Sequence, residues 1–167
     1  AYALGELHAE YVRGSPKIRQ SVKEFLPLIE GTAEWLTAVK NLGLIDKKKE
    51  LFEMFIDHED QSLAVEAAQT IIDGKGGVTF LRNQLNQSTG NSKKDLIRGL
   101  GLIRSGEDVQ KMLYISLTEG NHDLPTKRLL VESLGNSGHG QRLLYNMLES
   151  NELDEELVTT AALKLMY

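Results

Sequence analysis

The chain has 167 residues, of which 41% are hydrophobic and 26% are charged, with a formal net charge of −5 and no cysteine. This composition argues against an intrinsically disordered chain. The lack of cysteine excludes a disulfide framework, cysteine-ligated zinc, iron–sulfur clusters and a thiol nucleophile. The acidic balance argues against nucleic acid or an anionic membrane surface as the main partner, and no apolar run approaches the roughly 18 residues needed to span a membrane.

Apolar residues recur at helical spacing along the whole chain, and no sustained alternation indicates a strand. The pattern predicts an all-α protein of eleven helices. Pro27 is expected to kink the second helix or to end it early, and Ser15, Asp60, Asn91 and Asp123 stand where helix N-caps are expected. The predicted helices, in chain order, span residues 1–12, 16–30, 32–45, 47–57, 61–73, 77–87, 92–104, 106–118, 124–136, 139–149 and 153–166.

A leucine-glycine dipeptide, here called the Leu-Gly step, recurs near the ends of alternate helices at intervals of about 32 residues. Residues three and four positions before each leucine are small or apolar and lie on one helical face, as Ala67 and Ala68 do. Helices of this length cannot bury such a stripe alone, so we expect antiparallel pairs that stack on a continuous core; a globular helical bundle is the alternative. The copies are Leu4-Gly5, Leu42-Gly43, Leu100-Gly101 and Leu134-Gly135, with weaker ones at Ile71-Ile72 and Leu165-Met166.

A small or apolar pair followed by Leu-Gly, on the second helix of a pair of about 30–40 residues, resembles the HEAT-repeat class of α-solenoids. The resemblance covers essentially the whole chain, and 126–138 is the closest copy. It implies an α-α superhelix of five to six antiparallel pairs, with 1–167 as a single HEAT-like domain. Since both ends cut through predicted helices, we expect the chain to be a fragment of a larger protein.

A second resemblance rests on 140–149, continued by Leu153 and Glu155-Glu156-Leu157. This stretch resembles the helical region that precedes a cytochrome c-type haem domain in large bacterial dehydrogenase-like proteins. The resemblance implies a bacterial protein in the periplasm or another extracytoplasmic location; without it, a cytoplasmic location is expected. The haem attachment sequence Cys-x-x-Cys-His is absent, so no haem function is implied for this chain.

Patterns that carry chemistry are few. His58-Glu59-Asp60 and His122-Asp123 place imidazole beside carboxylate, but no histidine pair has the i, i+4 spacing of a metal site, so solvated helix junctions are favoured over a metal site. The segment 73–77 lacks the serine or threonine and the leading strand of a phosphate-binding loop, and it predicts an inter-helix turn. No serine stands in a recognisable relation to a histidine and a carboxylate. We therefore expect no catalytic residue, no metal and no cofactor.

In the HEAT family the second helix of each pair lines the concave surface. The leucine or isoleucine that begins each copy, at 4, 42, 71, 100, 134 and 165, is called its key position. The residue two positions before each key position points away from the apolar pair. Such a row of mixed charge suits protein recognition better than nucleic acid, and a merely solvated face is the alternative. The row predicted to bind a partner consists of Lys40, Gln69, Arg98 and Glu132.

These observations predict a non-enzymatic scaffold or protein-interaction module that presents a curved surface, or a spacer between domains. The expected partner is a protein or the flanking domains of the same chain, without nucleic acid and without membrane insertion; the oligomeric state is left open. The alternative is a HEAT-like enzyme such as an alkylated-base DNA glycosylase. That enzyme needs a strongly basic concave face with aromatic residues around an essential carboxylate, and a net charge of −5 does not favour it.

Overall fold

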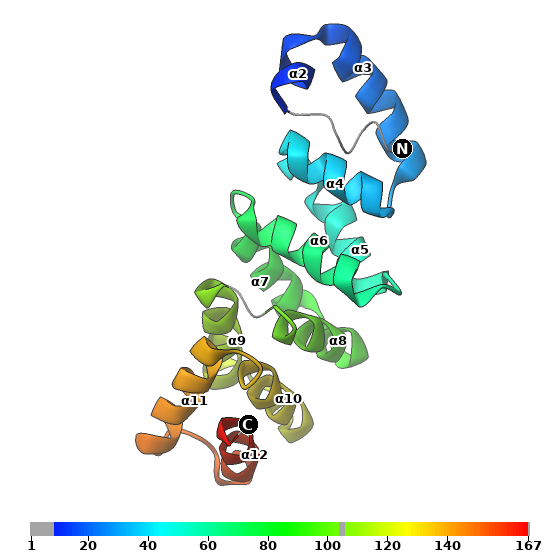
Figure 1. Ribbon diagram of the computed structural model, residues 1–167. Helices are drawn as coiled ribbons and strands as arrows, with labels where there is room; N and C mark the ends of the chain where they lie inside the picture. Colours follow the sequence, from blue (N-terminus) through cyan, green and yellow to red (C-terminus); the bar gives the residue numbers. More distant parts are fainter. Residues whose placement is uncertain (1–8, 104–105, 167) are drawn as a thin grey trace. The chain divides into compact units, whose positions relative to one another are not determined.

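The computed structural model describes residues 9–103 and 106–166, and within these ranges all regular secondary structure is helical (Figure 1). The described chain contains eleven α-helices, α2 to α12, which confirms the predicted all-α class. Most of the predicted helix 1–12 lies outside the described residues. None of the described helices is long and apolar enough to cross a membrane. The chain divides into two compact units, and the boundary between unit 1 and unit 2 lies between Gly77 and Val78 in the sequence.

Unit 1 consists of short helices joined by tight turns. The predicted second helix is divided, because α3 ends at Phe25 and a 3-10 helix with Pro27 at its start continues the chain. A proline cannot donate the backbone hydrogen bond that an α-helix needs at this place, so the predicted early end is confirmed. The elements are α2 (Ala9–Gly14), α3 (Pro16–Phe25), η1 (Leu26–Ile29), α4 (Ala33–Leu42), η2 (Ile45–Lys47), α5 (Lys48–Asp57) and α6 (Gln61–Asp73).

The core of unit 1 is formed where α6 packs against α4 and α5. Trp35 and Leu36 of α4 are each 1% exposed, and Leu51 of α5 is 2% exposed. Ala67 and Ala68 are both fully buried on α6, as the predicted apolar face requires. Their small side chains allow neighbouring helices to approach closely, so a larger residue at either position would have to displace packed atoms.

Unit 2 repeats one packing relationship between alternate helices. Figure 1 shows α10 between α8 and α12, and α10 contacts both of them. α11 packs against α9 in the same way, while α10 also contacts α9 and α11. Alternate helices of this unit therefore lie against one another. The elements are α7 (Gly77–Gln87), α8 (Gly90–Gly101), α9 (Glu107–Glu119), α10 (Leu124–Leu134), α11 (Gly138–Glu149) and α12 (Glu155–Leu165).

The Leu-Gly step has a packing function in unit 2. A β-carbon on Gly101 of α8 would lie 2.7 Å from the Cβ atom of Ser133 on α10. A β-carbon on Gly135, directly after α10, would lie 2.6 Å from the Cβ atom of Lys164 on α12. Ser133 and Lys164 each directly precede a key position of the repeat, so the same contact occurs twice, one repeat apart. Glycine is needed at both places because the helices are too close for a side chain.

The same dipeptide has a different function in unit 1. Gly43 has no neighbouring atom within 4 Å of a β-carbon position, and its φ of +61° is left-handed. Its backbone N–H caps α4 by donating to the carbonyl oxygens of Val39 and Lys40. Glycine tolerates this conformation without a steric cost, so Leu42-Gly43 ends a helix rather than admitting a neighbouring one.

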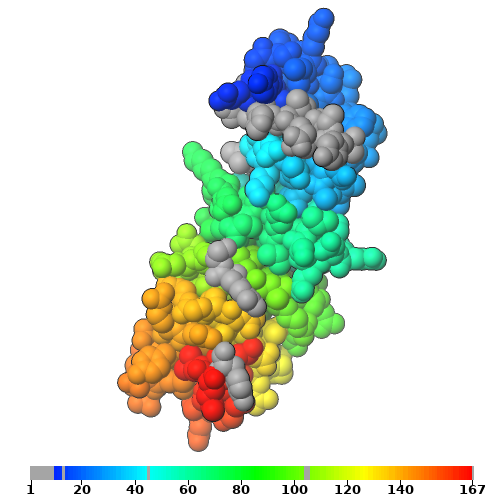
Figure 2. All heavy atoms as spheres, in the orientation of Figure 1, coloured from blue at the N-terminus to red at the C-terminus, as the bar shows by residue number. Residues whose placement is uncertain are grey.

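Side chains reinforce the stacking of alternate helices in unit 2. The Ser133 hydroxyl donates to the carbonyl oxygen of Ile97 at 3.3 Å, and the amide of Asn136 donates to the carbonyl oxygen of Gly101 at 3.3 Å. Lys164 Nζ donates to Asn136 Oδ1 at 3.1 Å, which continues the connection to α12. In Figure 2 the atoms of α10, α11 and α12, from yellow to red, lie directly against one another.

Helix capping agrees with the sequence at three of the four expected positions. The side chains of Ser15, Asp60 and Asp123 accept hydrogen bonds from the first-turn N–H groups of α3, α6 and α10. Asn91 is the exception, and that prediction is wrong. The extended residue before α8 is Thr89, and Gly90 enters the helix with a left-handed φ of +56°, so Asn91 already lies in the first turn.

Candidate functional site

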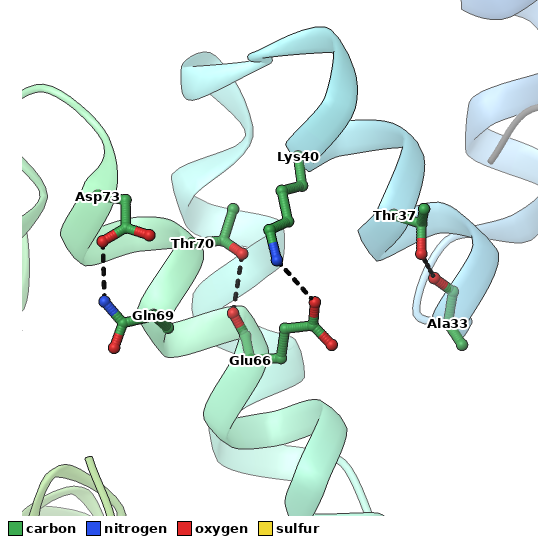
Figure 3. Close-up of polar contacts among 7 residues, drawn as sticks. All are labelled: Ala33, Thr37, Lys40, Glu66, Gln69, Thr70 and Asp73. Carbon is green, nitrogen blue, oxygen red and sulfur yellow. Dashed lines mark hydrogen bonds and ion pairs between the residues drawn. The ribbon is translucent and has the colours of Figure 1, made fainter. Parts of the chain in front are cut away.

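Two of the predicted partner-binding residues, Lys40 and Gln69, lie on adjoining helices of unit 1 (Figure 3). Lys40 extends from α4 toward α6, where its Nζ atom lies 3.1 Å from Glu66 Oε1. Gln69 Nε2 donates to Asp73 Oδ1 one turn further along α6, at 2.8 Å. The charge of Lys40 is therefore already matched by a neighbouring carboxylate, in an exposed ion pair that contributes little to stability.

The other two predicted residues, Arg98 and Glu132, lie on α8 and α10 of unit 2, which are also in contact. Arg98 Nη1 lies 2.7 Å from Asp95 Oδ1 on its own helix. Glu132 is exposed, and among the described residues it has no ion-pair or hydrogen-bond partner. The four residues therefore lie on two pairs of contacting helices, one pair in each unit, and Glu132 is the charged member without a partner among the described residues.

Lys40 also borders a hollow of about 140 Å³ formed by α4, α5, α6 and the turns between them. Lys48 lies on the same hollow, and Asp73 supplies a carboxylate there. The space is enough for a few water molecules but small for an organic ligand.

The lysine run 47–49, at the start of the predicted helix 47–57, is compensated locally by a carboxylate. Cations at a helix start oppose the helix dipole, but Glu50 lies in the first turn of α5 and its Oε1 atom contacts Lys47 Nζ at 2.5 Å. The hydrogen bond to Glu50 raises the pKa of Lys47. Burial acts to raise the pKa of Glu50, yet the hydrogen bond and charge of Lys47 outweigh it and hold that pKa below its usual value.

A larger polar hollow lies within unit 2, where α7, α8, the end of α9 and the turn after α9 meet. Its volume is about 400 Å³. At this place the turn brings the imidazole of His122 back onto α9, where Nε2 lies 3.0 Å from the Ser116 hydroxyl. The side chains that line the hollow are Arg82, Leu85, Asn86, Lys93, Met112, Ile115, Ser116, Glu119, Asn121 and His122.

Gly120 makes the close approach of His122 possible. A β-carbon on this glycine would lie 2.3 Å from His122 Nε2 and 2.3 Å from the backbone oxygen of Ser116. The φ of Gly120 is −80°, a value open to any residue, so glycine is required here by space and not by backbone conformation. The Ser116–His122 pair was missed in the sequence because it depends on this turn; a glycine two residues before a histidine is too common to indicate it.

The electrostatic surroundings of His122 favour the neutral imidazole. Burial lowers its pKa, and the positive charge of Lys93 lowers it further. Within the described residues no carboxylate forms an ion pair with His122. The adjacent Asp123 caps α10 through the N–H of Thr126 at 3.0 Å, and its hydrogen bonds with Thr126 lower its pKa. In the part of the chain that the structure describes, the Ser116 hydroxyl and the His122 imidazole are thus not joined by the orienting carboxylate of a hydrolytic triad.

The predicted helix junctions at His58 and after Asp73 have structural roles. His58 Nδ1 accepts the backbone N–H of Asp60 at 3.0 Å, which orients the turn before α6. In the described part of the chain no three side chains of histidine, aspartate or glutamate are arranged to hold a metal ion. The glycine-rich segment after Asp73 forms the turn between α6 and α7, as predicted, and Gly76 has a left-handed φ of +72°.

The chain was compared with protein-family models, with curated proteins and with solved structures, and none of them matches it. The class that its structure defines is therefore the coarse one, an all-helical protein whose helices pack against their neighbours.

Proposed function

We propose that this chain is a non-enzymatic scaffold built as a HEAT-like α-solenoid, which binds a protein partner or holds flanking domains apart. The observation that carries the proposal is the repeated contact in unit 2 between Gly101 and Ser133 and between Gly135 and Lys164. A contact that recurs one repeat later is expected of a stack of helix pairs, because each repeat meets only its neighbours. A globular bundle has no reason to repeat it.

The partner surface follows from the second helices of the pairs. The described second helices bury their small or apolar pairs, except that Ala162 of α12 is exposed. The residue two positions before the key position is exposed on α8 and α10, at Arg98 and Glu132. Energy at protein interfaces is concentrated in a few residues, and an unmatched charge such as that of Glu132 selects a partner of opposite sign. We therefore expect a partner that presents a lysine or an arginine to α10.

Site-specific photo-crosslinking tests this surface. A photoreactive amino acid at position 132 of α10 should capture a partner from an extract of the cells that express the protein. The matched control carries the same group in place of Tyr145, which is 54% exposed on α11, a first helix of a pair. Capture at 132 alone supports the proposal. Equal capture at both positions, or none at 132, contradicts it.

Charge reversal then tests the recognition chemistry with the captured partner. Glu132→Lys should weaken binding by roughly tenfold or more, the loss expected when a charged pair becomes a repulsive one. Glu149→Lys, the same change of charge on an exposed residue at the end of α11, should change affinity less than about twofold. If both variants lose affinity equally, the effect comes from net charge and not from this surface.

A measurement of DNA binding separates the scaffold proposal from the enzymatic alternative. An alkylated-base glycosylase must hold duplex DNA, and its affinity falls steeply as salt is raised because counterions are released. We expect no binding in the micromolar range at low salt from a chain of net charge −5. Micromolar binding with a steep dependence on salt would overturn the scaffold proposal in favour of the alternative.

A further inference from the structure

Several hydrogen-bond donors line the hollow of unit 2 around His122, and they have no partner among the described residues. Arg82 of α7 and Lys93 of α8 border it from two helices, and neither has an ion-pair or hydrogen-bond partner among the described residues. The amides of Asn86 and Asn121 are likewise unpaired within the described chain. Groups of this kind are the usual ligands of oxyanions, because each presents N–H bonds to a negatively charged oxygen.

The charges around the hollow favour an anion over a cation. Arg82 and Lys93 supply two positive charges, and of the described residues that line the space only Glu119 carries a carboxylate. With a neutral imidazole at His122, one formal positive charge remains. Burial and the charge of Lys93 lower the pKa of His122, Asp123 acts to raise it, and Lys127 acts in the same direction as Lys93.

The hollow is larger than the oxyanion itself requires. A volume of about 400 Å³ lies in the lower part of the range of small-molecule pockets, which is about 300–1,000 Å³. Its floor is apolar: Leu85 and Met112 are 1% and 2% exposed, and Ile115 is 37% exposed beside them. A ligand with one anionic end and one carbon portion would match the cationic rim and the apolar floor together.

We propose that this hollow binds a phosphate monoester, with Arg82, Lys93 and His122 around the phosphate group and Ile115 beside the carbon portion. A phosphate oxygen is an acceptor for the Arg82 guanidinium and the Lys93 ammonium, and its charge favours the imidazolium form of His122, which donates from both ring nitrogens. The Ser116 hydroxyl holds the imidazole at the edge of the hollow. The function assigned to the hollow is recognition, since among the described residues no carboxylate orients the Ser116–His122 pair.

Titration of the full chain with phenyl phosphate and with inorganic phosphate, followed by amide and imidazole NMR signals, tests the proposal. Phenyl phosphate should shift the signals of Asn86, Asn121 and His122 and bind roughly tenfold more tightly than inorganic phosphate, because only the ester reaches the apolar floor. Phenol, which lacks the anion, should not bind. Equal affinities for phenyl phosphate and inorganic phosphate, or shifts spread over unrelated basic residues, would overturn the proposal.

Matched variants identify the residues involved. Arg82→Gln and Lys93→Gln should each weaken phenyl phosphate binding by roughly tenfold, the effect of removing one charge-assisted hydrogen bond. The controls Arg142→Gln on α11 and Lys111→Gln on α9 remove the same charges from unit 2 outside the hollow and should leave the affinity unchanged. All four residues lie outside the buried core. Equal losses in variants and controls would show diffuse attraction and contradict the site.

The pKa of His122 provides a further test, because the pKa of a residue with a merely structural role would not change when the ligand binds. Saturating phenyl phosphate should raise the pKa of His122, because a dianion beside the imidazole stabilises its protonated form. The charged groups around this imidazole are Arg82, Lys93, Glu119, Asp123 and Lys127. An unchanged pKa at saturation would contradict the placement of the phosphate. The same titration with a capped phosphoserine addresses the natural source of the phosphate monoester. It distinguishes a phosphorylated protein segment from a small phosphate ester.

Discussion

Gly101 of α8 lies so close to Ser133 of α10 that a β-carbon on the glycine would stand 2.7 Å from the Cβ atom and 2.8 Å from the hydroxyl oxygen of the serine. The Cα atom of Ser133 would be only 3.0 Å away, so a rotation of the serine side chain cannot relieve the contact. The two helices are therefore held at a separation that glycine alone permits. Stability in unit 2 should depend on this separation.

Gly101→Ala should lower the free energy of unfolding by about 1–3 kcal/mol, because the added methyl group overpacks the contact. Urea denaturation measures the change. The control is Gly138→Ala at the start of α11, where no atom lies within 4 Å of the new methyl group, and where a gain of about 0.4–1 kcal/mol is expected from the less flexible unfolded chain. Equal effects of the two substitutions would mean that α8 and α10 are not in close contact.

Ser133→Gly should partly relieve Gly101→Ala, since it removes the side-chain atoms that the new methyl group meets. The double variant is then more stable than the sum of the two single losses predicts. A double-mutant cycle measures this coupling, which for residues in contact is about 0.5–3 kcal/mol. Strict additivity would contradict the contact between these two residues.

Ala68→Leu tests the core of unit 1. Ala68 is fully buried on α6, so the larger side chain should reduce stability by about 1–3 kcal/mol. Ala33→Leu is the matched control, because Ala33 is exposed at the start of α4 and its replacement should change stability by less than about 0.5 kcal/mol. Thermal and urea unfolding both report the difference. An unchanged melting temperature for Ala68→Leu would mean that this face of α6 is not in the core.

Two threonines at helix starts form a matched pair for capping. Thr32 Oγ1 accepts the N–H of Trp35 at 3.2 Å, whereas Thr89 makes no side-chain capping bond at the start of α8. Thr32→Ala should therefore cost about 1 kcal/mol of stability, and Thr89→Ala much less. Chemical denaturation of the two single variants measures both values. A larger loss at Thr89 would contradict the capping assignment.

The lowered pKa of His122 predicts a dependence of stability on pH. Below the ordinary histidine pKa of 6.5 the unfolded chain takes up a proton at this residue before the folded chain does, so the unfolded state binds more protons. The free energy of unfolding should therefore fall as pH is lowered through 6.5, and the full loss is reached below the folded pKa. Urea denaturation between pH 8 and pH 5, in buffers free of phosphate, measures the slope.

His122→Gln should flatten that slope, because glutamine retains a polar contact with Ser116 but does not titrate. Asn121→Ser is the control for disturbance of the turn, and it should retain the dependence of the wild-type protein. If His122→Gln leaves the slope unaltered, the imidazole is not the group that titrates with unfolding.

The sequence by itself determined the helices. Residues three and four apart lie on one face of a helix, and prolines and capping side chains act on neighbouring backbone, so Pro27, Ser15, Asp60 and Asp123 could be interpreted without a fold. The prediction for Asn91 is wrong because α8 begins one residue earlier, at Gly90. Gly90 has a left-handed φ, which no sequence pattern indicates.

Only the tertiary structure decided the function of each Leu-Gly step and the composition of the polar hollow. Gly43 and Gly101 stand in the same dipeptide, yet one ends a helix in a left-handed conformation and the other admits a neighbouring helix. Ser116 and His122 meet because a turn at Gly120 leaves room for an imidazole, and Arg82 and Lys93 reach the same space from other helices. Helix formation depends on residues within a turn or two, whereas these contacts depend on distances between segments that are remote in sequence and come together only in the folded chain.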